Sequence, residues 1–244
     1  MRLTRVHVTG PLSPNQRHTI EGDAANHISR VLRLEIGDPL TVFDGRGGEY
    51  AARIEAFSKG AVIVELRDPA AVSRESPLSL TLAQGVSRGE RMDWVVQKAT
   101  ELGVTRIVPV MTERTMVRLQ EAKQVERKLA HWQGIAVAAC EQSGRDRLPD
   151  IAAPIGLEHF LRDADAGATR LLLSPTGRQR VSELQAPHRK IVVLIGPEGG
   201  LAEGEQQAAI AVGFIAVRMG PRILRTETAA IAALTLLQHQ FGDL

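Results

Sequence analysis

An apolar pentapeptide, Ile191–Ile195, runs directly into the glycine-rich segment Gly196-Pro197-Glu198-Gly199-Gly200. Three glycines in five positions let a main chain approach a ligand closely and adopt the positive φ angles that turn N–H groups inward. The loops at 172–177 and 219–228 also follow apolar runs. Because open α/β sheets bind ligands at the carboxyl ends of parallel strands, we expect the three loops to enclose one cofactor. A tight turn into the next helix is the alternative for any one loop taken alone.

The second part of the chain alternates short apolar runs with helical patterns. Strands are expected at 78–83, 107–110, 170–173, 191–195 and 215–217. Helices are expected at 90–102, 120–140, 181–184, 203–212 and 226–241. Such alternation is typical of an α/β domain with a mostly parallel sheet covered on both faces.

The start of the chain has a different pattern, with short strands expected at 3–8, 40–43, 50–56 and 61–66. A hairpin turn at 44–48 joins the second strand to the third, which indicates a small β-barrel or sandwich. One helix is expected at 24–33, with Ile28, Val31 and Leu32 on a single apolar face. The small, polar and proline residues of 68–77 are typical of a linker, so we expect domains at 1–72 and 73–244.

The composition restricts the classes of function. Hydrophobic residues make up 43% of the 244, enough for a core, and no apolar run approaches the ~18 residues of a membrane span. The single cysteine, Cys140, excludes an intramolecular disulfide and is expected to be an inert core residue. The net charge is only +2, so a nucleic-acid-binding surface must be local. Because the start also has no apolar signal region, we expect a cytoplasmic protein.

Familiar cofactor and metal motifs are missing from the sequence. It has neither a Gly-x-Gly-x-x-Gly between a strand and a helix nor a Gly-Lys-Ser/Thr of a phosphate-binding loop. The seven histidines show no metal-ligand spacing, so we expect no metal site. The chain has only 3% aromatic residues, which argues against RNA binding by stacking of many unpaired bases on aromatic rings.

Several segments resemble the RsmE family of ribosomal RNA methyltransferases, namely Gln97–Val104, Ala139–Arg145, Gly196–Gly200, Met219–Ala229, His27 and Val31–Arg33. The resemblance spans nearly the whole chain. It implies an S-adenosylmethionine (SAM) dependent enzyme that methylates the ring imino nitrogen of one uridine in 16S small-subunit ribosomal RNA. It also implies a PUA-like N-terminal β-barrel, a SPOUT domain threaded into a trefoil knot, and a homodimer.

Carried over by motif, the resemblance assigns the SAM pocket to residues of the three loops. They are Leu173, Ser174, Leu194, Ile195, Gly196, Pro197, Glu198, Gly199, Gly200, Met219, Gly220, Ile223 and Leu224. Backbone groups would hold the adenine edges, and apolar side chains would form the walls. Glu198 would bond the ribose or a loop amide, with a solvated turn carboxylate as the alternative.

Methylation of an imino nitrogen requires its proton to leave and the resulting negative charge on the flanking carbonyl oxygens to be stabilised. We expect Arg225 to supply a guanidinium near a carbonyl, with an ion pair to Glu227 as the alternative. Glu227 is the candidate base, although Thr226 and Glu227 also look like the cap and first turn of a helix. Glu141 and Arg145 are further candidates on the substrate side.

For RNA binding the candidates are mostly cations of the barrel and of the region around the first helix of the second domain. They are Arg5, His27, Arg30, Arg33, Arg88, Arg91, Lys98, Glu141, Arg145 and Arg222. For any one arginine, a solvated surface position is the alternative, and His27 could instead sit against the barrel. Trp94 and Trp132 are expected to pack in the core or in a dimer interface rather than to stack on bases.

Three other functions stay open at this point. A knotted RNA methyltransferase could act on a ribose hydroxyl or a guanine. A non-catalytic ribosome-assembly factor could have kept the fold and lost the activity. A metabolic α/β enzyme could use the glycine loops to bind phosphate.

Overall fold

The computed structural model describes residues 4–70, 73–117, 119, 121–185 and 189–244. Leu3 and Gln120, where an expected strand and an expected helix begin, lie outside these residues, as does Val72 at the expected domain boundary. The chain forms two compact units. Unit 1 comprises Met1–Glu75 and Cys140–Leu148, and unit 2 comprises Ser76–Ala139 and Pro149–Leu244.

Unit 1 contains a five-stranded sheet with the order β1-β3-β4-β5-β2. Its strands are β1 (Arg5–His7), β2 (Arg17–Ile20), β3 (Pro39–Phe43), β4 (Glu49–Ser58) and β5 (Ala61–Ala70). β1 pairs with β3 in parallel, and the other neighbours pair antiparallel. The hairpin between β3 and β4 confirms the expected turn. β2 was not expected, because only Ile20 of its four residues is buried and the alternation is too short to read.

The helix expected at 24–33 is instead a short helix, α1 (Gly22–Asn26), followed by a π-helical turn (His27–Val31). The Leu32 N–H bonds to the carbonyl of His27, five residues earlier, at 2.9 Å. A π turn rotates each residue less than an α turn does, so the expected single apolar face was wrong. Ile28 is fully buried, whereas Val31 is 68% exposed.

The segment Cys140–Leu148 joins unit 1 through buried ion pairs. Arg145 donates to the carboxylate of Glu75, with Nη2 at 2.6 Å from Oε2. Arg5 forms an ion pair with Glu49 and also donates Nη2 to the carbonyl of Arg145 at 3.0 Å. Buried charges persist when they are paired and hydrogen-bonded in this way, which gives these arginines a structural role.

Unit 2 contains an eight-stranded sheet with the order β11-β13-β10-β12-β6-β7-β8, and β9 also pairs with β7. The strands are β6 (Ser79–Gly85), β7 (Arg106–Met111), β8 (Asp150–Ile151), β9 (Ile155–Gly156), β10 (Thr169–Leu173), β11 (Gln179–Arg180), β12 (Lys190–Ile195) and β13 (Ile215–Arg218). All of its pairings are parallel. The expected mostly parallel α/β sheet is therefore confirmed.

The helices that accompany this sheet are α2 (Glu90–Glu101), α3 (Ala122–Ser143), α4 (Leu157–Asp163), α5 (Glu203–Ala211) and α6 (Thr226–Phe241). The last residues of α3, from Cys140, belong to unit 1. A 3-10 turn, Val181–Glu183, occupies the position of the expected short helix at 181–184. The seven-residue α4 was not expected, because its two turns are too short to show a clear helical period.

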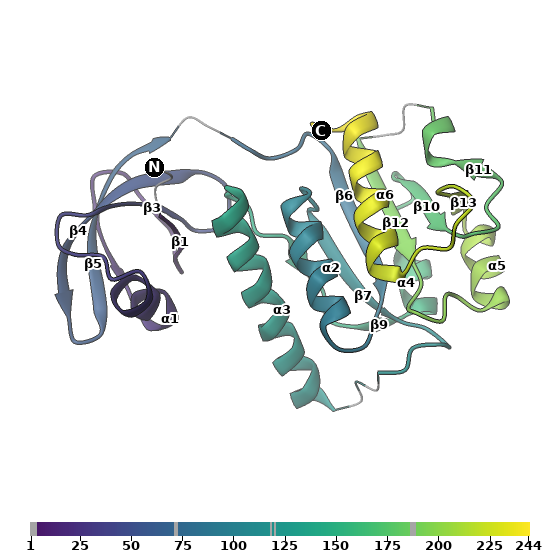
Figure 1. Ribbon diagram of the computed structural model, residues 1–244, viewed down its shortest axis with the longest axis horizontal. Helices are drawn as coiled ribbons and strands as arrows, with labels where there is room; N and C mark the ends of the chain where they lie inside the picture. The colour runs from purple at the N-terminus through teal and green to yellow at the C-terminus, as the bar shows by residue number, and fades with distance from the viewer. Residues whose placement is uncertain (1–3, 71–72, 118, 120, 186–188) are drawn as a thin grey trace. The chain divides into compact units, whose positions relative to one another are not determined.

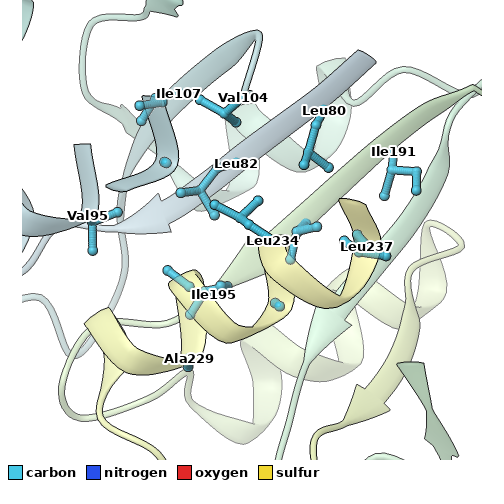
Figure 2. Close-up of a cluster of buried hydrophobic side chains, with 14 of the residues drawn as sticks. Leu80, Leu82, Val95, Val104, Ile107, Ile191, Ile195, Ala229, Leu234 and Leu237 are labelled. Atoms are coloured by element: carbon cyan, nitrogen blue, oxygen red, sulfur yellow. The ribbon is translucent and has the colours of Figure 1, made fainter. Parts of the chain in front are cut away.

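Helices cover both faces of the unit 2 sheet (Figure 1). Ile195 of β12 lies in one buried cluster with Val95 of α2 and Leu234 of α6 (Figure 2). Its neighbour Leu194 points to the opposite face and joins a second cluster with Phe160 of α4. Successive strand residues alternate between faces, so a strand buried on both sides reads as a continuous apolar run.

Candidate functional site

A pocket of about 610 Å³ lies where β10, β12 and β13 end. Its lining residues come mainly from the three loops that follow these strands. They are Arg91, Arg114, Leu173–Thr176, Ile195–Leu201, Gln206, Met219, Gly220, Arg222–Glu227 and Ala229. Parallel strands place their carboxyl ends at one edge of the sheet, which brings together loops that are distant in sequence.

The pocket gathers the residues proposed from the sequence for cofactor binding, with one exception. Leu194 does not line it, because this side chain is fully buried on the face of β12 that packs against α4. Ile195, one residue later, does reach the pocket. The difference follows from the two-residue period of the strand.

Close backbone packing explains the small residues at the ends of β6 and β12. A Cβ added at Gly85 would lie 2.4 Å from the backbone N of Pro197. A Cβ added at Gly196 would lie 2.8 Å from the carbonyl carbon of Gly200. Both contacts are with backbone atoms, so any side chain here would displace the loop that lines the pocket.

A hydrogen-bonded group ties this loop to the start of α6. The Thr226 hydroxyl donates to the carbonyl oxygen of Gly196 at 2.7 Å and accepts from Gln84 Nε2 at 2.8 Å. The helix begins at Thr226 as expected, but Thr226 is not its cap. Arg225 is the N-cap residue and makes no side-chain capping bond. The threonine hydroxyl instead holds two parts of the pocket together.

A second polar group connects the loop after β10 with α5. The buried Ser174 hydroxyl donates to Gln206 Oε1 at 3.0 Å and lies 3.0 Å from the Thr176 hydroxyl. Gln206 Nε2 then donates to the carbonyl of Leu201 at 3.2 Å. Each polar atom in this wall therefore has a partner, which keeps the loop conformations well determined.

Arg225 and Glu227 both line the pocket but do not form the ion pair that was the alternative for them. Arg225 is exposed and has no carboxylate within 4.0 Å in the part of the chain that the structure describes. The cation beside Glu227 is Arg91, with Nε at 4.0 Å from Oε1. Glu227 Oε2 is buried and accepts no hydrogen bond from any described residue, so it offers a free acceptor.

Glu198 is held by the start of α2. Its Oε1 accepts from the backbone N–H of Arg88 at 2.9 Å and from Arg91 Nη1 at 3.0 Å. Burial is the largest influence on its pKa and raises it, but the amides of Arg88 and Glu198 and the Arg91 guanidinium together outweigh burial and lower the pKa. The carboxylate thus bonds a loop amide, which is one of the two roles expected for it.

The RNA-binding candidates of unit 2 lie in different settings. Arg222 is exposed and lines the pocket, and Arg88 is exposed beside Glu198. Arg91 lines the pocket but is paired with Glu198. Lys98 is directed to Glu101, with Nζ at 2.8 Å from Oε1, and does not line the pocket.

The candidates of unit 1 divide into buried and exposed groups. Arg5 and Arg145 have side chains only 6% and 4% exposed and are engaged in the ion pairs described above, so they do not present guanidinium groups to an RNA phosphate. Glu141 accepts the backbone N–H of His7 at 2.9 Å. The exposed candidates are His27, Arg30 and Arg33.

Sequence reasoning missed several residues that line the pocket or support its loops. Arg114 follows β7, and the end of a parallel strand is the same signal that located the three loops. Gln206 and Gln84 showed no such signal, because a polar residue in a helix or strand normally reads as a surface position. Thr176 lay in a loop that was recognised but was not itself singled out.

The described residues contain no cluster of three or more His, Cys, Asp or Glu side chains placed to hold a metal ion. Within the same residues, no helix is both long and apolar enough to span a bilayer.

The sequence matches a family model of the RNA methyltransferase domain at residues 74–238 and one of the RNA methyltransferase PUA domain at residues 20–67. The fold, the pocket and these matches define an RNA methyltransferase. The ribosomal RNA small subunit methyltransferase E of Buchnera aphidicola is 32% identical over 242 residues, covering 99% of this chain and 95% of that protein. The chain belongs to the ribosomal RNA small subunit methyltransferase E family.

Two solved structures agree over their full length. The ribosomal RNA small subunit methyltransferase E of Neisseria gonorrhoeae, bound to S-adenosyl methionine, is 37% identical with a TM-score of 0.94. A protein of Legionella pneumophila, in complex with the bound cofactor SAM, is 39% identical with a TM-score of 0.95. Each covers 100% of this chain and is itself covered completely.

Proposed function

We propose that this protein transfers the methyl group of SAM to 16S ribosomal RNA, and that the acceptor is the imino ring nitrogen, N3, of a uridine. The pocket enclosed by the loops after β10, β12 and β13 carries this proposal. Family membership and the SAM-bound relatives support the same cofactor and the same class of substrate.

The pocket fits SAM in size and chemistry. Its volume of about 610 Å³ lies within the ~300–1,000 Å³ typical of small-molecule sites. Gly200 and Gly220 have φ angles of 68° and 78°, and a Cβ added at either would meet no atom within 4 Å. The main chain therefore borders open space there, while Leu173, Met219 and Leu224 supply apolar surface. SAM, when bound, supplies an electrophilic methyl group on a sulfonium.

In this proposal Glu227 accepts the proton of uridine N3 through its Oε2 atom, which is buried and without a hydrogen-bond partner among the described residues. Arg225 stabilises the negative charge that spreads onto the carbonyl oxygens of the uracil ring. The N3–H bond would break with its proton passing to the carboxylate, and N3 would form the new bond to the methyl carbon as the S–CH3 bond breaks, whose electron pair would stay on sulfur and leave a neutral thioether. Positioning of both reactants in one pocket is itself a large contribution to the rate.

We extend the proposal to RNA binding by unit 1 and to assembly. His27, Arg30 and Arg33 are exposed around the π-helical turn and would contact the RNA. Trp132 is buried in the core, whereas Trp94 is 56% exposed on α2 and would suit a homodimer contact. The substrate would be 16S RNA, free or in an assembled small subunit, in the cytoplasm. The knotted threading of the chain stays a prediction.

The decisive test is methyl transfer with the substrate's position and atom identified. The purified protein, SAM labelled on the methyl group, and small subunits from a strain lacking the protein would be incubated, and nuclease fragments analysed by mass spectrometry. We expect one methylated uridine with the methyl on N3. A methyl on a ribose hydroxyl or a guanine would instead identify a different acceptor.

Two further measurements separate the remaining alternatives. Calorimetric titration with SAM should show binding, whereas a non-catalytic assembly factor should show no heat. A metabolic α/β enzyme should bind a nucleotide and have no affinity for 16S RNA, which filter binding would detect.

A further inference from the structure

A tight turn after β7 presents Arg114 to the pocket. The turn, residues 112–115, is closed by the Thr115 N–H to the carbonyl of Thr112 at 3.0 Å. The Thr112 N–H also donates to the Thr115 hydroxyl at 2.9 Å. Threonine hydroxyls in such positions stabilise turns by forming hydrogen bonds with main-chain groups.

The turn is fastened to the start of α5 by one carboxylate. Glu205 Oε1 accepts the backbone N–H of Glu113 at 2.8 Å, and Oε2 accepts that of Ala202, also at 2.8 Å. Hydrogen bonds to a charged acceptor are stronger than neutral ones, so the backbone on both sides is well held. Arg114, next in the chain, is therefore placed by a fixed support and not by a loose loop.

Arg114 also contacts the glycine loop directly. Its Nη1 donates to the carbonyl of Gly199 at 2.9 Å. A Cβ added at Gly199 would lie 3.2 Å from the Cβ of Arg114, so the side chain passes close over this glycine. A guanidinium has five N–H donors, and this bond uses one of them.

The arginines that line the pocket differ in whether a carboxylate compensates their charge. The Arg91 guanidinium is compensated by Glu198. Arg114, Arg222 and Arg225 also line the pocket and are exposed, but in the described part of the chain none has a carboxylate within 4.0 Å. Three uncompensated guanidiniums at one opening favour an anion there.

We propose that Arg114 is a substrate-binding residue, which contacts an RNA phosphate beside the target nucleotide while the bond from its Nη1 to the Gly199 carbonyl orients the guanidinium. This inference rests on the proposed function, since it requires RNA to approach this pocket. An RNA phosphate matches the planar guanidinium, and the exposed position suits a ligand that arrives from solvent.

The test compares Arg114→Met and Arg114→Lys with the wild type, and with Arg162→Met as control. Arg162 is an exposed arginine of α4 that does not line the pocket. Affinity for a 16S RNA transcript would be measured over a salt series, and SAM affinity by calorimetry. We expect R114M to lower the log–log salt slope by roughly 0.7 to 0.9, the value for one lost phosphate contact, while R114K and R162M keep the wild-type slope.

The SAM affinity shows whether each variant is folded. It also tests whether Arg114 binds the amino-acid carboxylate of SAM and not an RNA phosphate. In the proposal, R114M binds SAM within about twofold of the wild type and loses RNA affinity by roughly tenfold. Weaker SAM binding with an unchanged salt slope would overturn it. If 5′-methylthioadenosine, which lacks the amino-acid carboxylate, then bound both proteins equally, the arginine would be assigned to that carboxylate. A wild-type protein that fails to methylate 16S RNA would instead refute the proposed function.

Discussion

Thr226 offers the sharpest test of how the pocket is held together, through the substitution Thr226→Val. Valine has nearly the same shape but neither donates to the Gly196 carbonyl nor accepts from Gln84 Nε2. Thr226 and Gln84 are buried, with exposed fractions of 7% and 0%. Water therefore cannot replace the lost partner, and the polar groups that remain bear a desolvation cost.

The cost of this substitution can be estimated from the remaining contacts. Gln84 Nε2 keeps a bond to the Gly85 carbonyl at 3.1 Å and a long one to the Gly196 carbonyl at 3.4 Å. Each group is thus only partly unsatisfied, toward the lower end of the ~1–3 kcal/mol for a buried unpaired group. For the two groups together we expect Thr226→Val to lower the free energy of unfolding by about 2 to 3 kcal/mol.

Two control variants isolate the hydroxyl. Thr226→Ser keeps it and loses one methyl, at a cost of about 0.8 kcal/mol. Thr235 of α6 donates its hydroxyl to the Ile231 carbonyl at 2.9 Å but is exposed, so Thr235→Val should stay within ~0.5 kcal/mol.

Urea unfolding followed by circular dichroism would measure the stabilities, and calorimetry the SAM affinity. Thr226→Val should also bind SAM more weakly than Thr226→Ser, because the Gly196 loop loses its anchor. The reasoning is refuted if the valine and serine variants have equal stability and equal SAM affinity.

The other predictions concern catalysis, packing and the thiol. Arg225→Ala should abolish methyl transfer with SAM affinity roughly kept, and normal turnover would remove Arg225 from catalysis. Gly85→Ala should destabilise the protein by about 1 to 3 kcal/mol, because its Cβ would lie 2.4 Å from the Pro197 backbone, whereas Gly134→Ala in α3, with open space around its Cβ, should be neutral or stabilising in urea unfolding. Burial is the main cause that raises the pKa of Cys140 to about 12, so iodoacetamide at pH 8 should alkylate it only after unfolding. Since the pKa of this thiol is raised above its ordinary value of 9.0 in the folded protein, its contribution to stability should be lost as pH rises from about 9 to 12, and rapid labelling of the native protein would contradict this assignment.

Patterns confined to a few neighbouring residues were enough to predict much of the fold. The run Ile191–Ile195 is apolar at every position, as in a strand buried on both faces, and the alternation of such runs with helical patterns predicted the parallel sheet. The glycine-rich segment after it marked a place where a backbone must approach something closely. Both inferences depend on local rules of strand and turn geometry.

Where a prediction from the sequence was wrong, the cause was a long-range contact or a small change of helical period. The π-helical turn at His27–Val31 moved Val31 to the surface, and no residue type in that run signals the wider turn. Arg5 and Arg145 read as surface cations, but they are buried because Glu49 and Glu75, distant in the chain, compensate their charges. A sequence pattern does not show which acid will meet which base.

The sequence alone therefore determined the architecture of the sheet, the three loops that line the pocket, and the family resemblance that pointed to SAM and ribosomal RNA. Only the tertiary structure decided which side chains within those loops line the pocket and what holds them there. Leu194 and Ile195 are adjacent yet lie on opposite faces of one strand. Arg114, Gln84 and Gln206 enter the site through hydrogen bonds between elements far apart in sequence, and such bonds depend on distances that exist only after the chain has folded.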